Sequence, residues 1–309
     1  MSNKIIIVAG DPNSINSEII YKAFKKIDNK TKKRLYLIGS FNLICRQFKK
    51  LNYKSKVIKI KNIEDNIIST NLKIIDIPIN FKNPFKINFK TSSKYVLKSL
   101  NLAHSLAEKK KVKGIINCPI DKNLLKVSKK IGVTEFLASK CKIKNSTEVM
   151  LIHNKKFSVV PLTTHLDIKN IAKKITSKLI IQKLKSLNKE FKKIFKIKPK
   201  IGVLGLNPHN AELKRKSEEV KIIIPAISKL KKFGLNIYGP LVADTTFVDN
   251  YKKYDVVVGM YHDQVLTPFK TLFHFDAINV TLGLRYLRVS PDHGPAIDLI
   301  GKNKANYLS

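Results

Sequence analysis

The sequence predicts an α/β protein built from two domains. Apolar, β-branched runs such as residues 4–9 and 113–117 alternate with stretches of helical spacing such as residues 92–107. This alternation is typical of a parallel sheet with helices on both faces. The chain has 309 residues, more than one typical domain, so we expect two α/β/α domains with a cleft between them.

The first part of the chain contains well-separated strand and helix patterns. Strands are expected at residues 4–9, 34–38, 56–60, 73–77 and 113–117, because each is a short apolar run bounded by polar or turn residues. Helices are expected to follow the capping side chains Asn16 or Ser17, Ser40, and Ser92 or Ser93. Residues 80–90 are irregular and predict a surface loop.

The second part of the chain continues the alternation. Further strands are expected at residues 148–153, 157–162, 201–206 and 256–260, and helices at 135–141 after a Thr134 cap, 167–195, 217–233 and 294–301. No repeat or low-complexity linker marks a boundary. We place residues 1–130 with 285–309 in a first α/β domain, and 131–284 in a second α/β domain that carries most of the candidate site residues.

The composition narrows the class of protein. The formal net charge is +38, which raises the alternative of a basic nucleic-acid-binding protein. The lysines are spread along the chain, however, and no helix-turn-helix, zinc-finger or RNP motif accompanies them, so nucleic acid is not the expected partner. Three scattered cysteines without a CxxC pair, and an apolar N-terminal run of only five residues, predict a soluble cytoplasmic protein with no membrane segment.

Three predicted strands each deliver a histidine at their carboxyl end. His165 follows the run at 157–162, His209 follows the run at 201–206, and His262 follows the run at 256–260. Ligands gather at such strand ends in α/β proteins. A single histidine there is more often structural, but three together are candidates for binding a divalent metal through neutral imidazole nitrogens.

Other side chains suit an anionic substrate or proton transfer. Lys270, Asn279 and Arg288 are donors that could hold a phosphate group. Candidates for proton transfer or for contact with a metal-bound imidazole are Asp121, Lys122, Asp244 and Asp263, although acids at strand ends often only cap turns. No GxGxxG fingerprint is present, so cofactor contacts are not assigned by a motif; Asp292 and His293 are the candidates.

Taken together, the motifs resemble the 4-hydroxythreonine-4-phosphate dehydrogenase family of pyridoxal phosphate biosynthesis. The matching segments run in order from residue 10 to residue 301: GDPNSINSE, NCPIDK, GVTEF, LTTHL, GLNPHNAE, GPLVADTTF, YDVVVGMYHDQ and NVTLGLRYLRVSPDHGPAIDLIG. The resemblance implies an isocitrate/isopropylmalate-dehydrogenase-like fold. It also implies a homodimer whose active sites lie in the interdomain cleft at the subunit interface, with metal ligands from both subunits.

The resemblance also implies the chemistry and the residues. The metal ligands would be His165, His209 and His262, and the ion zinc, magnesium or cobalt. Substrate contacts fall on Thr134, Lys270, Asn279 and Arg288. NAD or NADP would oxidise 4-phosphooxy-L-threonine to 2-amino-3-oxo-4-phosphooxybutanoate, which decarboxylates to 3-amino-2-oxopropyl phosphate.

The sequence departs from the family pattern at three places. Val133 stands where the family usually has a histidine before the threonine. The first loop has Asp11 with Asn13, Ser14 and Asn16 in place of a GEPAGIG-like sequence, and Asp121 replaces a common asparagine. Val133 is the main argument for an alternative, a paralogue that oxidises another 4-phosphorylated hydroxy acid of the phospho-threonate type.

Overall fold

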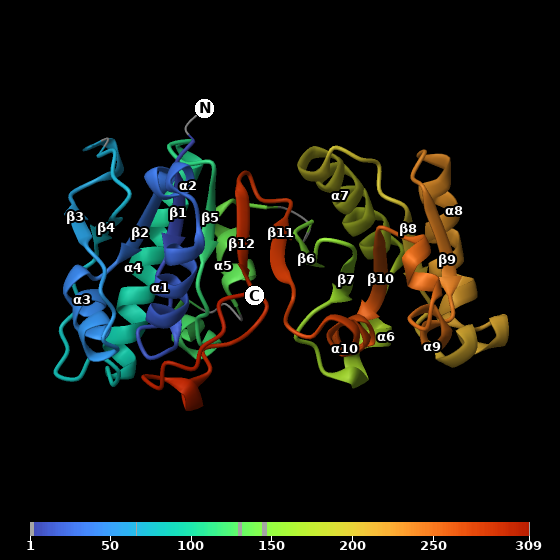
Figure 1. Cartoon of the computed structure of the whole chain (residues 1–309). Helices are drawn as coiled ribbons and strands as arrows, with labels where there is room; N and C mark the ends of the chain where they lie inside the picture. The colour runs from blue at the N-terminus through green and yellow to red at the C-terminus, as the bar shows by residue number, and fades with distance from the viewer. Residues whose placement is uncertain (1–2, 66, 129–131, 144–146, 309) are drawn as a thin grey trace. The chain divides into compact units, whose positions relative to one another are not determined.

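The computed structural model describes residues 3–65, 67–128, 132–143 and 147–308. The chain divides into two compact units (Figure 1): unit 1 is Met1–Cys141 with Arg285–Ser309, and unit 2 is Lys142–Leu284. The first domain boundary predicted from the sequence, near residue 130, falls in 129–131, outside the described residues. Helices and strands alternate in both units, which confirms the predicted α/β fold class.

Unit 1 contains a parallel sheet with strand order β3-β4-β2-β1-β5-β12. Every strand pair in this set is parallel. Because the last strand returns from the far end of the chain, unit 1 is discontinuous in sequence. The strands are β1 Ile5–Val8, β2 Leu35–Gly39, β3 Val57–Ile60, β4 Leu72–Asp76, β5 Gly114–Asn117 and β12 Leu287–Pro291.

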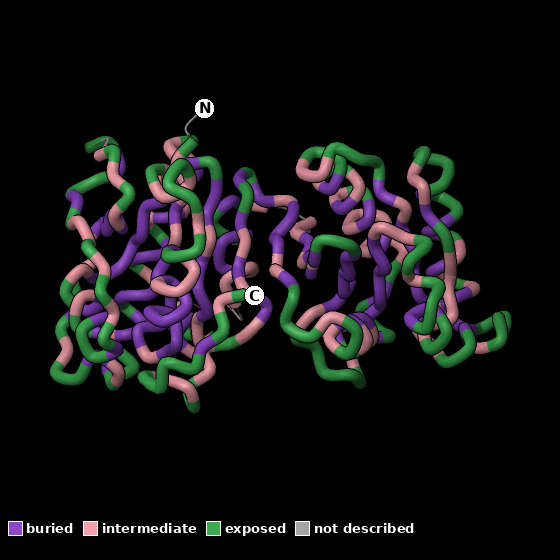
Figure 2. The backbone as a smooth tube through the Cα atoms, in the orientation of Figure 1, coloured by how far each residue is buried: buried purple, intermediate pink, exposed green. Residues whose placement is uncertain are grey.

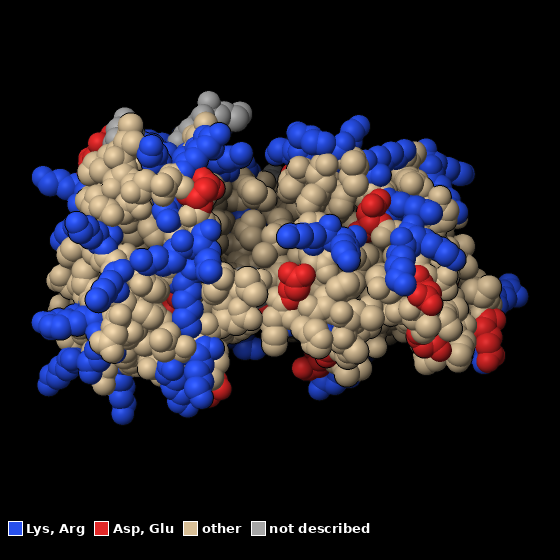
Figure 3. Space-filling view, viewed as in Figure 1, with Lys and Arg blue, Asp and Glu red and all other residues tan. Residues whose placement is uncertain are grey.

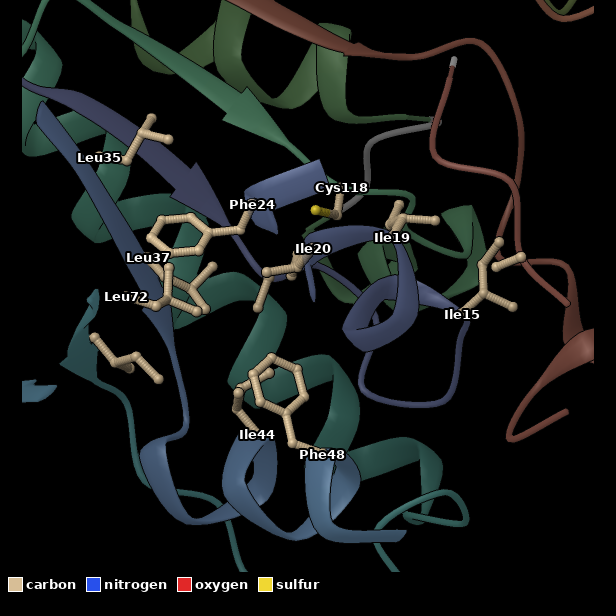
Figure 4. Close-up of a cluster of buried hydrophobic side chains, with 13 residues drawn as sticks. Ile15, Ile19, Ile20, Phe24, Leu35, Leu37, Ile44, Phe48, Leu72 and Cys118 are labelled. Atoms are coloured by element: carbon tan, nitrogen blue, oxygen red, sulfur yellow. The ribbon is translucent and has the colours of Figure 1, made fainter. Parts of the chain in front are cut away.

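Helices bury both faces of this sheet. Phe24 and Phe48, from α1 and α3, pack with Leu37 and Leu72 in one apolar cluster (Figure 4). Side chains alternate between the faces of a strand, so the buried Ile38 next to Leu37 points to the other face, and α4 packs against the same strands. The helices of unit 1 are α1 Asn16–Lys26, α2 Asn29–Arg34, α3 Phe41–Lys50, α4 Phe89–Glu108 and α5 Val133–Lys140, with short 3-10 turns at η1 Ile63–Asp65, η2 Lys122–Ser128 and η7 Ile297–Leu299.

Unit 2 contains a mixed sheet with strand order β11-β6-β7-β10-β8-β9. Strands β7, β10, β8 and β9 are parallel, whereas β6 is antiparallel to both β11 and β7. The sheet is therefore less purely parallel than the sequence predicted. The strands are β6 Val149–His153, β7 Ser158–Thr163, β8 Ile201–Leu204, β9 Ile237–Leu241, β10 Val256–Tyr261 and β11 Ile278–Leu282.

Both faces of the unit 2 sheet are buried as well (Figure 2). Val159 and Val257 pack in a cluster with Phe269 of α10, and the alternate residues Val160 and Val258 are equally buried on the opposite face. The helical segments are η3 Ile168–Asn170, α6 Ile171–Lys174, α7 Ser177–Phe195, η4 Pro208–Leu213, η5 Glu219–Ile223, α8 Ile224–Lys232, α9 Ala243–Thr246, η6 Asn250–Lys253 and α10 His262–Phe273.

Several predicted helix starts are wrong, because tertiary contacts use the expected capping side chains. Asn16 does not cap α1; its amide donates to the carbonyl groups of Ala9 and Pro119. Helix α4 begins at Phe89 with Asn88 as its cap, whereas Ser92 and Ser93 are buried inside the helix. The Ser40 cap of α3 is confirmed by its hydrogen bond from the Leu43 N–H.

Two predicted helices are shorter than expected, and one helix was not predicted. The stretch 167–195 breaks after Lys174, and α7 starts afresh with Thr176 as its side-chain cap. Residues 294–301 form only the three-residue turn η7. The helix that was not predicted is α10, which starts at His262 directly after β10.

Candidate functional site

The three strand-end histidines lie at one edge of the unit 2 sheet. Their strands are neighbours in the order β7-β10-β8 and run parallel, so their carboxyl ends meet at the same edge. The ring centroids of His165 and His262 are 6.3 Å apart, with 31° between the ring planes. His165 and His209 are exposed and His262 is half-buried. A ligand that binds at the carboxyl ends of the strands would therefore bind at this edge.

The start of α10 orients His262. Its Nδ1 atom lies 2.7 Å from Oδ1 of Asp263, which leaves Nε2 as the nitrogen available to a ligand. A metal-bound histidine usually makes this kind of second contact to a carboxylate. Asp263 was predicted as a candidate for such a contact, and its role beside a metal stays a prediction.

The loop that carries His209 has an unusual backbone. Five consecutive residues in η4, from His209 to Leu213, have φ angles between 48° and 56°, and none of them is glycine. His165 also has a φ of 51°. Left-handed conformations of L-residues cost about 1–2 kcal/mol each, and such strain is concentrated at functional sites. We refer to residues 205–213 as the His209 loop.

The donor set at this edge is suited to a divalent metal. Three imidazoles are a common ligand set for zinc or cobalt and leave coordination positions open for a substrate. Within the described part of the chain, however, the group of three ligand-type side chains whose atoms lie within 4.8 Å of one another is a different one: His104, Glu108 and Cys141. The strand-end histidines of one chain are more widely spaced.

Contacts within the protein account for that other cluster. The His104 Nδ1 atom lies 2.9 Å from the Tyr286 hydroxyl, and the Glu108 carboxylate is paired with Arg285 at 3.0 Å. Burial raises the pKa of the Cys141 thiol, so the neutral thiol rather than the metal-binding thiolate is favoured. We assign no metal role to these three residues.

Unit 1 brings two of the predicted substrate residues together. Arg288 on β12 is buried, its Nε donates to Asn117 Oδ1 at 2.6 Å, and its Nη1 donates to Thr134 Oγ1 at 3.4 Å. Burial lowers the pKa of Arg288 to about 10, although the Glu135 carboxyl group acts in the opposite direction, so the guanidinium is charged at neutral pH. The predicted helix-capping role of Thr134 is wrong: α5 is preceded by Gly132, with no side-chain cap.

Asn117 contacts the predicted substrate residue Arg288 and was not itself among the predicted site residues. It ends β5, the strand next to β12, and it accepts the shortest hydrogen bond of Arg288. Its position at a strand end, within the NCPIDK segment, is the same signal that selected the three histidines.

The other two predicted substrate residues lie in unit 2. Lys270 is on the last turn of α10, with its Nζ 5.4 Å from the centre of the Phe275 ring. Asn279 is on β11, opposite Ile152 of β6. Its Oδ1 atom is buried without a hydrogen-bond partner among the described residues.

The remaining candidates make local contacts. Asp121 and Asp244 accept the backbone N–H of Asn123 and Thr245, at 2.9 and 2.7 Å, which are the turn-capping contacts considered as the alternative. Lys122 is exposed at the start of η2. Asp292 is buried after β12, and the His293 Nδ1 atom lies 2.8 Å from the Gly294 carbonyl oxygen.

The comparisons with known proteins decide the family. A model of the family "Pyridoxal phosphate biosynthetic protein PdxA" matches residues 30–309. The chain belongs to this family. A 4-hydroxythreonine-4-phosphate dehydrogenase from Sulfurihydrogenibium sp. (strain YO3AOP1) is 38% identical over 99% of this chain and 94% of its own length, and one from Aquifex aeolicus (strain VF5) is 36% identical over 100% and 95%.

Solved structures of PdxA-type proteins have the same fold. A 4-hydroxythreonine-4-phosphate dehydrogenase from Klebsiella pneumoniae superposes with a TM-score of 0.84 at 26% identity, covering 99% of this chain and 95% of the other. One from Burkholderia phymatum gives 0.81 at 28% identity, covering 100% and 95%. Among the described residues, no helix combines the length and apolarity needed to cross a membrane.

Proposed function

We propose that this chain oxidises 4-phosphooxy-L-threonine with NAD or NADP and a divalent metal held by His165, His209 and His262. The match to the PdxA family over residues 30–309 carries the activity: the chain is an oxidoreductase of the 4-hydroxythreonine-4-phosphate dehydrogenase type, acting in pyridoxal phosphate biosynthesis. The single structural observation that supports the metal set is the delivery of three histidines to one sheet edge by the neighbouring parallel strands β7, β10 and β8.

The reaction transfers a hydride from the carbinol carbon to the nicotinamide and a proton from the hydroxyl group to a base. The product, 2-amino-3-oxo-4-phosphooxybutanoate, loses CO2 to give 3-amino-2-oxopropyl phosphate. His165, His209 and His262 would hold the divalent ion, with zinc, magnesium and cobalt as the candidates, and the ion would supply positive charge next to the oxygen atoms of the substrate. Asp263 keeps the His262 ring oriented through the 2.7 Å contact at Nδ1.

The chain's donors hold the anionic substrate in this proposal. Arg288 and Lys270 bind the phosphate, since a guanidinium and an ammonium group match its charge. The Thr134 hydroxyl, which accepts from Arg288, completes that part of the site. Asn279 is the proposed side chain that orients the substrate. Asp292 and His293 are the proposed cofactor contacts.

We also propose that the enzyme is a homodimer with metal ligands from both subunits. The observation that supports this is the spacing of the three histidines within one chain. Their ring nitrogens do not come together as closely as the ligand atoms of His104, Glu108 and Cys141, which lie within 4.8 Å of one another. If a second copy of the chain supplies one of the metal ligands, the three histidines of one protomer do not need to lie close together.

One observation favours a second substrate class. Val133 replaces the histidine that the family usually has beside the threonine of this motif, and its aliphatic side chain cannot donate a hydrogen bond to the substrate. A 4-phosphorylated hydroxy acid without the amino group, of the phospho-threonate type, is therefore the alternative substrate.

The test is reduction of NAD and NADP by the purified protein with 4-phosphooxy-L-threonine or 4-phospho-threonate, after EDTA treatment and after addition of zinc, magnesium or cobalt. We expect metal-dependent turnover of 4-phosphooxy-L-threonine by the unmodified protein and no turnover by His209→Ala. The matched control is His274→Ala, which removes an exposed histidine that also has a left-handed φ, of 51°. Turnover of phospho-threonate alone would select the alternative, and full activity of His209→Ala would remove the metal assignment.

A further inference from the structure

Glu219 places a buried carboxylate beneath the His209 loop. The residue is 0% exposed and lies at the first position of η5. Its Oε1 atom accepts the backbone N–H groups of Leu206 and Asn207, both at 2.8 Å. The Asn207 amide also donates to Oε2 at 3.0 Å. All of these donors belong to the two residues that come directly before Pro208 and His209.

These hydrogen bonds keep the carboxylate charged in spite of its burial. Burial by itself would raise the pKa of Glu219, but the N–H donors of Asn207 and Leu206 outweigh it and the pKa is lowered. An ionised acceptor makes stronger hydrogen bonds than a neutral one. The start of the His209 loop is therefore held by a charge-assisted anchor.

We propose that Glu219, acting through Asn207, is a positioning residue that holds the His209 loop in its left-handed course and so places the His209 imidazole for metal binding. The inference rests on the proposed function, in which His209 is a metal ligand. Because the loop contains five consecutive non-glycine residues with positive φ, its course depends on contacts that fix it from outside.

Two further side chains fix the His209 loop, one toward α10 and one toward β9. Gln264 on α10 donates from Nε2 to the Gly205 carbonyl oxygen at 2.8 Å, and its Oε1 accepts the Met260 N–H at 2.7 Å. Gln264 thus ties the end of β8 to the end of β10. On the other side, Asn210 donates from Nδ2 to the Pro240 carbonyl oxygen at 3.1 Å. The loop is thus bound to three elements: η5 through Glu219, α10 through Gln264, and β9 through the Pro240 carbonyl oxygen.

The metal affinity of the protein tests directly whether Glu219 positions His209. The metal-free protein is titrated with Co²⁺, followed by its visible absorption, and with Zn²⁺ in competition with a chelator. For Glu219→Gln we expect roughly 10- to 100-fold weaker binding, the range seen when residues behind a metal ligand are removed. Asn207→Ala keeps the buried carboxylate and the Asn207 backbone N–H, and it removes the side-chain amide that donates to Glu219 and, at 2.9 Å, to Glu218. We expect a loss of about 10-fold in a variant that folds.

Glu18→Gln is the matched control. Glu18 is also 0% exposed, and its carboxylate also accepts two backbone N–H groups, those of Asn303 and Ala305, but it belongs to unit 1. We expect it to lower the melting temperature without changing Co²⁺ or Zn²⁺ affinity. If Glu219→Gln acted only through stability, the two variants would behave alike.

His209→Ala separates the two proposals. If it does not weaken Co²⁺ binding, His209 is not a ligand and the proposed metal set fails, together with the positioning role. If it weakens binding while folded Glu219→Gln and Asn207→Ala bind Co²⁺ like the unmodified protein, the metal set stands and the positioning role is overturned. Weaker binding in all three, with Glu18→Gln unchanged, supports the positioning role.

Discussion

Asp11 lies in the loop after β1 with its carboxyl group buried. One carboxylate oxygen accepts the Asn13 N–H at 2.8 Å, and the other accepts the Asp121 N–H at 3.4 Å. Burial is nevertheless the larger influence and raises the pKa of Asp11 from 3.8 to about 6. The folded protein therefore binds this proton more tightly than the unfolded chain does.

The raised pKa of Asp11 predicts a pH dependence of stability. A folded-state pKa above the unfolded value means that the free energy of unfolding falls as the pH rises from about 4 to about 6 and is level above that, by up to about 3 kcal/mol in total. Asp11→Asn should remove this slope and unfold at a higher temperature at pH 7 to 8. Thermal melts from pH 4 to 8 measure it, with Asp298→Asn, an exposed acid of the same unit, as the control.

The prediction is tested by how the melting temperature of the unmodified protein and that of Asp11→Asn each change with pH. If Asp11→Asn and the unmodified protein keep a constant difference in melting temperature across pH 4 to 8, burial of the Asp11 carboxylate does not carry the effect. A slope that disappears only in Asp11→Asn, and not in Asp298→Asn, confirms it.

At the level of single residues, the structure brings two of the predicted substrate residues together. Arg288 and Thr134 were both selected as substrate residues and lie within hydrogen-bonding distance of each other. The pairing itself was not predictable, because it joins residues 154 apart in sequence and depends on the return of β12 to unit 1. The hydrogen bond from Arg288 to Asn117 was not predictable for the same reason, because it joins residues 171 apart in sequence.

At the scale of elements, Gly205 shows how the end of β8 constrains the His209 loop. The Cβ atom of an alanine here would lie 2.0 Å from Oδ1 and 3.1 Å from Cγ of Asn210. Asn210 is buried and its amide is bound to the Pro240 carbonyl oxygen, so its side chain cannot simply swing away. The close approach requires glycine at this position.

Gly205→Ala is therefore expected to destabilise the protein by about 1–3 kcal/mol, the usual penalty for overpacking a filled site, and to weaken Co²⁺ binding because the His209 loop must shift. Urea unfolding and Co²⁺ titration measure the two effects. Gly294→Ala is the control, since its Cβ would meet no atom within 4 Å. Equal stability of the two variants would show that the loop accommodates a methyl group.

Element types were more predictable than element ends. Strands β1 to β8 and β10 followed from apolar runs, whereas β9, β11 and β12 were not predicted. The histidines after β7, β8 and β10 could be selected because the carboxyl ends of parallel strands meet at one edge. What the pattern could not show is where a helix begins. α10 starts at His262 because the strand feeds directly into it, and α7 restarts after Thr176 because that hydroxyl caps the Leu179 N–H.

At the scale of the whole molecule, the charge is the dominant property. The formal net charge is +38, and Figure 3 shows lysine and arginine side chains scattered over the visible face, with few acids among them. A nucleic-acid site would gather this charge into a stripe or patch with a recognition motif. The scattered distribution does not support the nucleic-acid alternative and is instead a source of self-repulsion in the folded state.

Self-repulsion predicts that salt stabilises the protein. The Debye length falls from about 30 Å at 10 mM to about 8 Å at 150 mM ionic strength. Repulsion between lysines on different elements, which destabilises the compact state, is therefore screened over that range. We expect the melting temperature to rise between 10 and 150 mM NaCl. Choline chloride at equal ionic strength should give the same rise, because screening does not depend on the cation. A flat or falling melting temperature would show that close ion pairs such as Lys59–Asp76, at 2.7 Å, outweigh the long-range repulsion.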